Sequence, residues 1–324
     1  MKRRKTVTRV LLWILGAVIM LLAVLYLTVT LVYHRYFSAA EAAFIVPGMD
    51  SPFVQQGFDY VQEKDVYLVS GYMANGSASR IYIRENSGAV RYVELKNTDG
   101  GDYTRHCGGI CHNGRYVYVA GRNGLLVFTL DDILDGGNAT VVGQIETGFD
   151  ISFCTFYDGH LLAGEFYRQD SHDTDPSHWQ TTPGGQENFA LIAVYQAAEG
   201  GTFGIVPTPV AAISAPELVQ GICFTGRDEI VLSTSYGFAS SYLSYHRIDT
   251  RRMGQMVLSG KEIPLLYLDS ESLTDSVALP PMAEEIVCRD GKVYVMCESA
   301  SNKYIFGKFI RGYQVFAFER EGEK

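Results

Sequence analysis

Motifs that mark several common enzyme classes are missing from this chain of 324 residues. It lacks the G-x-S-x-G motif of α/β-hydrolases, the glycine-rich phosphate loop, and the G-x-G-x-x-G dinucleotide fingerprint. These absences argue against a serine hydrolase of that fold, a P-loop nucleotidase and a Rossmann-type dehydrogenase.

Positive charge is also scarce. The chain has 27 Lys and Arg against 36 Asp and Glu, for a formal net charge of −9, although its first nine residues are strongly basic. Nucleic acids and anionic lipid surfaces bind basic protein surfaces. We therefore predict no nucleic acid partner, and the balance also disfavours anionic lipid.

Long apolar runs are absent beyond the first 41 residues, but one is present before that point. Residues 10–33 carry no charge, and about 24 residues at 1.5 Å each are enough to span a hydrocarbon core of roughly 30 Å. The sequence therefore predicts a basic tail at 1–9, a transmembrane helix at 10–33 that contacts the membrane, and a linker at 34–41.

The basic tail predicts the orientation, because Lys and Arg favour the cytoplasmic side. We expect a single-pass protein of the plasma membrane, with a cytoplasmic N-terminus and an extracytoplasmic remainder. The alternative is a signal peptide cut near the small residues 38–40. The apolar region of such a peptide is about 7–15 residues, which is shorter than this run.

Cysteine is sparse, and its positions argue against a disulfide framework. Five of the six cysteines fall on or beside the first strand of a repeat, and Cys297 falls on a second strand. Cys107 and Cys111 would lie about 13 Å apart on an extended strand, too far for a bond. We predict buried free thiols, and neither this pair nor any other has metal-ligand spacing.

An internal repeat is what the sequence does contain. Each repeat has a small or polar pair, a turn and a β-rich strand, and a third strand follows. The paired strands of the five repeats meet at turns near residues 63–65, 113–114, 158–159, 226–228 and 290–291. A fourth strand often comes next, and four strands per unit at about 45–65 residues is typical of propeller blades.

The predicted fold is therefore all-β: a five-bladed β-propeller over residues 42–320, preceded by one N-terminal transmembrane helix and followed by a tail at 321–324. The last repeat stops after its third strand, so the short apolar segment 42–46 is expected to supply its outer strand and close the ring. Six blades remain an alternative, because 242–279 holds three strand candidates: 242–248, 265–268 and 276–279.

Candidate site residues lie where the repeats place polar side chains around the central channel. Starts of first strands contribute Gln56, His106, Ser152, Gln220, Glu284 and Glu285, and ends of second strands contribute Arg122, Glu165, Tyr236 and Glu298. We expect His106, Gln220 and Glu284 to converge at the channel mouth. The alternative is that these positions are polar only because water fills the channel.

The longest insertion, residues 168–187, carries two histidines, His172 and His178, beside several acids. Long loops on rigid scaffolds often carry function, but this spacing matches no standard metal site. No metal site and no cofactor are predicted, although a calcium ion in the channel stays open.

Two functions from different classes fit these features. The first is a binding or scaffolding module displayed at the cell surface, with a small molecule, a glycan or a protein as ligand. The alternative is a hydrolase or lyase that acts on a small polar or sugar-like substrate, since Glu165, Glu284 and Glu298 are expected near the channel mouth. The sequence leaves catalytic residues, ligand identity and oligomeric state open.

Three runs carry a resemblance to known proteins: EFYR…TDPSHWQTTPGGQENFALIAVY, QGICF…IVLSTSYG and PPMAEEIVCRDGKVYVMCESASNKY. They resemble an uncharacterised family of membrane-anchored or secreted bacterial proteins, over most of residues 50–305. More distantly, the repeats are similar to lactonase and strictosidine-synthase-like propellers. Those hold calcium with Glu, Asn and Asp from separate blades, and this sequence does not show that full set.

Overall fold

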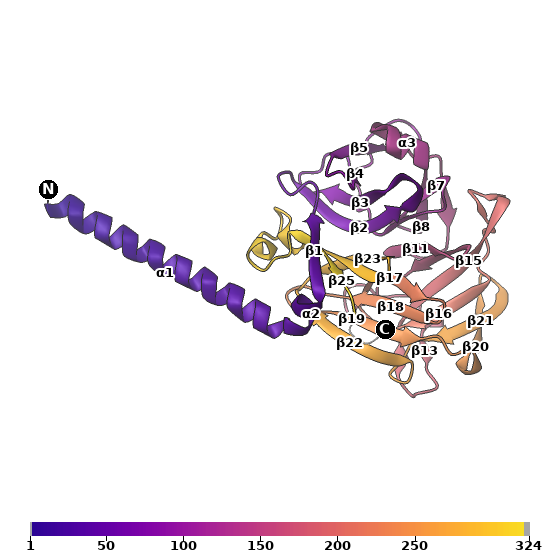
Figure 1. The fold of residues 1–324 in the computed structure, drawn as a ribbon. Helices are drawn as coiled ribbons and strands as arrows, with labels where there is room; N and C mark the ends of the chain where they lie inside the picture. The colour runs from indigo at the N-terminus through magenta and orange to yellow at the C-terminus, as the bar shows by residue number, and fades with distance from the viewer. Residues whose placement is uncertain (1, 321–324) are drawn as a thin grey trace.

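The computed structural model describes residues 2–320, and its strands form a ring of five blades (Figure 1). The predicted tail 321–324 lies outside the described residues. The first blade contains β2 (Phe53–Val61), β3 (Val66–Met73), β4 (Arg80–Glu85) and β5 (Val90–Lys96). The second contains β6 (Ile110–His112), β7 (Tyr116–Gly121), β8 (Gly124–Thr129) and β10 (Gly143–Glu146).

The other blades repeat this order from the centre outwards. The third contains β11 (Phe153–Tyr157), β12 (His160–Gly164), β15 (Ala190–Thr202) and β16 (Ala211–Ala215). The fourth contains β17 (Val219–Gly226), β18 (Glu229–Thr234), β19 (Ser241–Arg247) and β22 (Leu273–Leu279). The fifth contains β23 (Ala283–Arg289), β24 (Lys292–Cys297), β25 (Gln314–Phe318) and β1 (Ala40–Ile45).

The first strand closes the ring as predicted. β1 pairs antiparallel with β25, with Ala40 opposite Phe318 and Ile45 opposite Gln314. The last blade therefore takes its outer strand from the beginning of the propeller segment, which leaves β25 without an open edge.

The additional strand candidates extend existing blades and do not form a sixth one. The hairpin β20 (Gly254–Leu258) and β21 (Lys261–Tyr267) joins the third blade through parallel pairing of β21 with β16. A short strand, β9 (Gly137–Thr140), similarly extends the first blade beside β5. Five blades are therefore correct. The six-blade alternative is wrong because the extra strands pair in parallel with the outer strands of blades that already have four strands.

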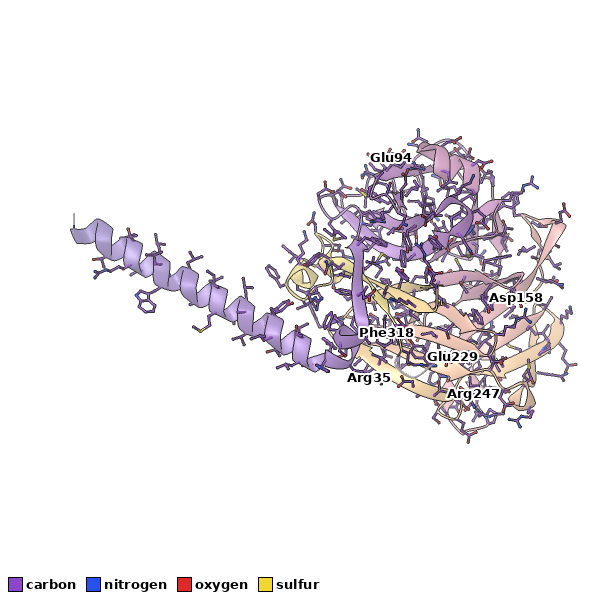
Figure 2. All side chains as sticks on the ribbon, viewed as in Figure 1. Arg35, Glu94, Asp158, Glu229, Arg247 and Phe318 are labelled. Carbon is purple, nitrogen blue, oxygen red and sulfur yellow. The ribbon has the colours of Figure 1, made fainter. Side chains whose placement is uncertain are left out.

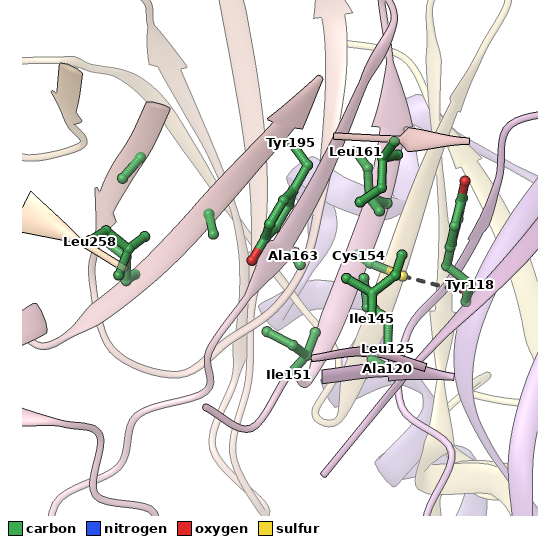
Figure 3. Close-up of a cluster of buried hydrophobic side chains, with 14 of the residues drawn as sticks. Tyr118, Ala120, Leu125, Ile145, Ile151, Cys154, Leu161, Ala163, Tyr195 and Leu258 are labelled. Atoms are coloured by element: carbon green, nitrogen blue, oxygen red, sulfur yellow. Dashed lines mark hydrogen bonds between the residues drawn. The ribbon is translucent and has the colours of Figure 1, made fainter. Parts of the chain in front are cut away.

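Packing between blades buries most of the apolar side chains. Figure 3 shows one such cluster, in which Tyr118 and Leu125 of the second blade meet Cys154 and Leu161 of the third. All six cysteines are free, and only Cys288 is partly exposed. Free thiols behave as small buried apolar groups here, as the spacing of the cysteines predicts.

Helices are short except at the N-terminus. Helix α1 (Lys2–Val32) includes a stretch, Thr6–Val32, that is long and apolar enough to cross a membrane. The predicted basic tail 1–9 is thus largely helical, and the segment expected as a linker forms helix α2 (His34–Ala39) and the start of β1. Helix α3 (Leu130–Asp135) follows β8, with Thr129 capping its first turn.

The base of α1 packs firmly against the propeller. Tyr36 of α2 is buried and stacks on Phe318, with ring centroids 5.6 Å apart. Val29 and Tyr33 join the same apolar cluster between the fourth and fifth blades. The junction between helix and propeller is therefore part of the folded core.

Candidate functional site

One cavity of about 1120 Å³ occupies the central channel at the face where first strands begin and second strands end. Nine of the ten predicted candidate residues line it, and seven of them together come from all five blades: Gln56, His106, Glu165, Gln220, Tyr236, Glu284 and Glu298. Ser152 and Arg122 also line the cavity. Ring closure thus brings together positions that lie far apart in the sequence.

Glu285 is the exception among the predicted channel residues, because it lies in a packed layer outside the cavity lining. Its carboxylate accepts hydrogen bonds from the backbone N–H groups of Phe58, Ile110 and Cys154, at 2.8, 2.6 and 2.9 Å. These residues belong to the first, second and third blades. Burial raises the pKa of Glu285, while the three amide donors act in the opposite direction.

Glycines let the innermost strands approach closely around Glu285. A Cβ at Gly109 would lie 2.2 Å from Oε1 of Glu285 and 2.6 Å from Cα of Phe153. A Cβ at Gly221 would lie 2.6 Å from Cα of Glu285. The innermost strands of neighbouring blades are therefore in close backbone contact at the Glu285 layer.

Glu284, the residue before it, has a different environment. Its side chain lines the cavity, is only 4% exposed, and has no hydrogen-bond partner among the described residues. Burial, together with the nearby carboxyls of Glu298 and Glu285, raises its pKa well above the usual range. A carboxyl in this state can donate or accept a hydrogen bond, and no side chain or backbone group of residues 2–320 is bonded to it.

Glu298 lies beside Glu284 and is held by Gln56. The amide Nε2 of Gln56 donates to Oε2 of Glu298 at 2.7 Å. Burial raises the pKa of Glu298 to about 7, although Gln56 and Lys303 oppose the shift. The charge of Glu298 in turn contributes to the raised pKa of Glu284, so the two carboxyls act on one another inside the cavity.

The third predicted carboxylate, Glu165, is already engaged. Nδ1 of His178 lies 3.0 Å from both carboxylate oxygens, and the N–H of Leu191 donates to Oε2 at 3.0 Å. Burial raises the pKa of Glu165, and the pKa of His178 is also raised because contact with Glu165 outweighs the effect of burial. This pair anchors the long insertion against the third blade.

Other parts of the cavity wall carry imidazole and aromatic groups. The ring of His106 lies 5.1 Å from that of Tyr72, and desolvation together with Lys303 and His172 lowers its pKa to about 4. His106 is therefore neutral at pH 7. The ring of Tyr236, which lines the cavity, lies 3.9 Å from the guanidinium carbon of Arg168.

Sequence reasoning missed the segment between β24 and β25. Tyr304 from this segment lines the cavity, and Nζ of Lys303 is bonded to the hydroxyl of Tyr72 at 2.6 Å. The signal was the long gap at residues 298–313, between the second and third strands of the last repeat, where most other repeats have short turns. It also missed Asp150 and Phe166, which line the cavity from loops of the second and third blades.

The arrangement provides hydrogen-bonding groups without a metal cluster. No group of three or more His, Cys, Asp or Glu side chains able to hold a metal ion occurs in residues that the structure describes. His172 and His178 are separated in role, since His178 is bound to Glu165 and His172 packs edge-on against Phe166. The cavity can offer carboxyl, imidazole and amide groups to a polar molecule.

No protein-family model and no curated protein matches the sequence. Solved structures with a similar fold include the glutaminyl cyclase of Myxococcus xanthus, with a TM-score of 0.44 and 9% identity over 86% of this chain and 94% of that chain. A gluconolactonase of Xanthomonas campestris gives 0.42 and 11% identity over 87% and 86%. A putative oxidoreductase of Thermus thermophilus, described as a glucose dehydrogenase, gives 0.44 and 13% over 86% and 98%.

The distant similarity to lactonase-type propellers is thus present in the structure as well. Because the TM-scores lie below 0.5, these likenesses carry no argument about activity.

Proposed function

We propose that this protein is a membrane-anchored binding module that holds a small polar ligand bearing hydroxyl or amino groups in its central cavity. Glu284 is the observation that carries the proposal. A buried carboxyl without a hydrogen-bond partner is costly, and this one lies on the wall of a cavity large enough for a small molecule. A ligand with donor groups would satisfy it.

The neighbouring groups support the same ligand class. Glu298 accepts from Gln56 and has remaining acceptor capacity, while neutral His106 and the amide of Gln220 each offer both a donor and an acceptor. Aromatic side chains at the rim, Tyr236 and Phe166, provide flat apolar surface beside these polar groups. Hydroxyl-rich or amine-bearing molecules match this combination.

The membrane anchor is part of the proposal. The apolar helix α1 would span the bilayer, and the basic residues before it favour a cytoplasmic N-terminus and an extracytoplasmic propeller. Cleavage near residues 38–40 would remove buried Tyr36 and separate Tyr33 from the propeller. Such a loss of core argues for an anchor that stays attached.

A direct test is a thermal-shift screen of the full chain in lipid nanodiscs. The probes are monosaccharides, amino sugars, polyols and polyamines. We expect a stabilising probe whose effect is lost in Glu284→Gln and reduced in Gln220→Ala. The matched control is Asp290→Asn, an exposed acid on the β23–β24 turn of the same blade, which should respond like the parent chain.

Equal stabilisation of the parent and Glu284→Gln by every active probe would contradict a site at Glu284. A panel with no stabilising probe would contradict the proposed ligand class.

The alternative, a hydrolase or lyase, is supported by the two neighbouring carboxyls of Glu284 and Glu298 in the cavity. A carboxyl with a pKa near 7, as at Glu298, suits general acid–base catalysis at neutral pH. Incubation of each stabilising probe and its glycosides with the parent chain, followed by mass spectrometry, separates the two functions. Product formation that disappears in Glu298→Gln would favour the enzyme, whereas unchanged probes would favour the binding module.

A further inference from the structure

The cavity mouth and the membrane helix lie on the same side of the propeller. Two loops contribute tyrosines to the lining of the cavity. Residues 235–240 contribute Tyr236, and residues 298–313 contribute Tyr304. The same two loops touch the base of α1. The hydroxyl groups of Ser240 and of Tyr33, the residue directly after α1, lie 3.1 Å apart, and α1 contacts η5 (Phe306–Phe309).

The overall arrangement agrees with these contacts. In Figure 1, α1 extends away from the propeller on the side where the yellow segment between β24 and β25 projects. Asp158, which marks the turn between β11 and β12 at the opposite end of its blade, lies on the far side from α1 in Figure 2. A membrane crossed by α1 would therefore face the cavity mouth and not the turn at Asp158.

Exposed apolar side chains gather on these two loops. Phe238 is 79% exposed, Ile305 55% and Phe309 48%, and the ring of Phe238 lies 4.9 Å from that of Phe306. We call Phe238, Ile305, Phe306 and Phe309 the apolar rim. Clustered exposed apolar groups of this kind mark interaction sites.

The backbone of the rim is also unusual. Ile305 has a φ of 54°, a conformation that is costly for a β-branched residue. The surrounding fold holds this residue with its apolar side chain exposed. Lys303 and Lys308 lie on the same loop, so the rim combines aromatic and basic groups as membrane-interface segments do.

We infer that the apolar rim inserts into the head-group layer of the bilayer that α1 spans, so that the cavity opens towards the membrane surface. The bilayer is the partner that the structure favours for the apolar rim, because the rim is continuous with the base of the membrane helix. The ligand of the cavity is then the polar end of an amphiphile whose apolar part stays in the bilayer. This ligand class rests on the proposed binding function and the anchoring helix.

Insertion of the rim can be measured by fluorescence quenching. The full chain carrying Trp13→Phe is reconstituted in phosphatidylcholine vesicles with one fifth phosphatidylglycerol, with and without brominated acyl chains. We expect the emission added by Phe238→Trp to be lost in brominated vesicles. Val257→Trp, on an exposed site of β20 that is 67% accessible, is the matched control and should keep its emission.

The origin of the ligand needs a second measurement. A photoreactive benzoylphenylalanine replaces Tyr304 at the mouth, or Val257 as control, and the reconstituted chain is irradiated and weighed by mass spectrometry. We expect lipid adducts at position 304 and none at 257. Equal quenching at positions 238 and 257 would overturn insertion of the apolar rim. Absence of lipid adducts at position 304 would overturn the proposal that the cavity binds the polar end of an amphiphile.

The experiments separate failure of the membrane orientation from failure of the proposed binding function. Stabilisation by a water-soluble probe that depends on Glu284, together with no quenching at position 238, would leave the binding site intact and refute only its orientation towards the bilayer.

Discussion

Glu284 and Glu285 are neighbours in sequence but belong to two regions of the propeller with opposite hydrogen bonding. Glu285 sits in the packed layer and receives three backbone N–H groups from three blades. Glu284 sits at the cavity wall and receives none from the described residues. The difference shows that the same residue type can link three blades in one layer and lie without a hydrogen-bond partner among the described residues in the next.

Replacing the acid of the packed layer should have the largest effect. Glu285→Ala leaves three buried amides without an acceptor, and we expect a loss of about 3–5 kcal/mol in the free energy of unfolding. Urea denaturation of the purified full chain at pH 7 measures it. Glu284→Ala on the same strand is the control, and an equal loss in both variants would remove the distinction between the two layers.

Close packing around Glu285 gives the second prediction. Gly109→Ala places a Cβ against Glu285 and the backbone of Phe153, and neither the buried carboxylate nor the backbone can move away easily. We expect destabilisation of about 1–3 kcal/mol. Gly200→Ala, where a Cβ would have open space, is the control. Identical melting temperatures for the two variants would mean that the layer is less tightly packed than described.

The cavity acids should make stability depend on pH. The pKa of Glu298 is about 7 in the folded chain and near its ordinary value of about 4.3 when unfolded. The folded state then binds more protons between these values, so stability falls as pH rises from about 5 to 8. Denaturation midpoints across this range should decline in the parent and decline less in Glu298→Gln. A parallel decline in both would show that Glu298 is not responsible.

The smallest effect is expected for the cavity acid itself. Glu284→Gln at pH 5 replaces a neutral carboxyl with an amide of similar size, and no hydrogen bond is lost. We expect the free energy of unfolding to stay within about 1 kcal/mol of the parent. Chemical denaturation at this pH checks it. A cost similar to that of Glu285→Ala would mean that Glu284 is structural and would count against the cavity as a binding site.

The sequence by itself determined the architecture and much of the polar lining of the central cavity. Strands alternate with turns at Asn113-Gly114, Asp158-Gly159 and Asp290-Gly291, so the repeat is visible without coordinates. A repeat that closes on itself places equivalent positions around one axis. That symmetry explains why His106, Gln220 and Glu284 were predicted to converge and do line one cavity.

Only the tertiary structure decided what each polar group does. Adjacent strand residues face different neighbours, and the register shift between Ala283 and Ile286 sets which acid meets the backbone of other blades. Likewise, the partner of Glu165 is His178, from a loop whose path the repeat does not specify. Parallel pairing of β21 with β16 also places β21 in the third blade and not in a sixth one. These contacts depend on how non-repeated segments pack in three dimensions, and a local pattern of residues does not encode that packing.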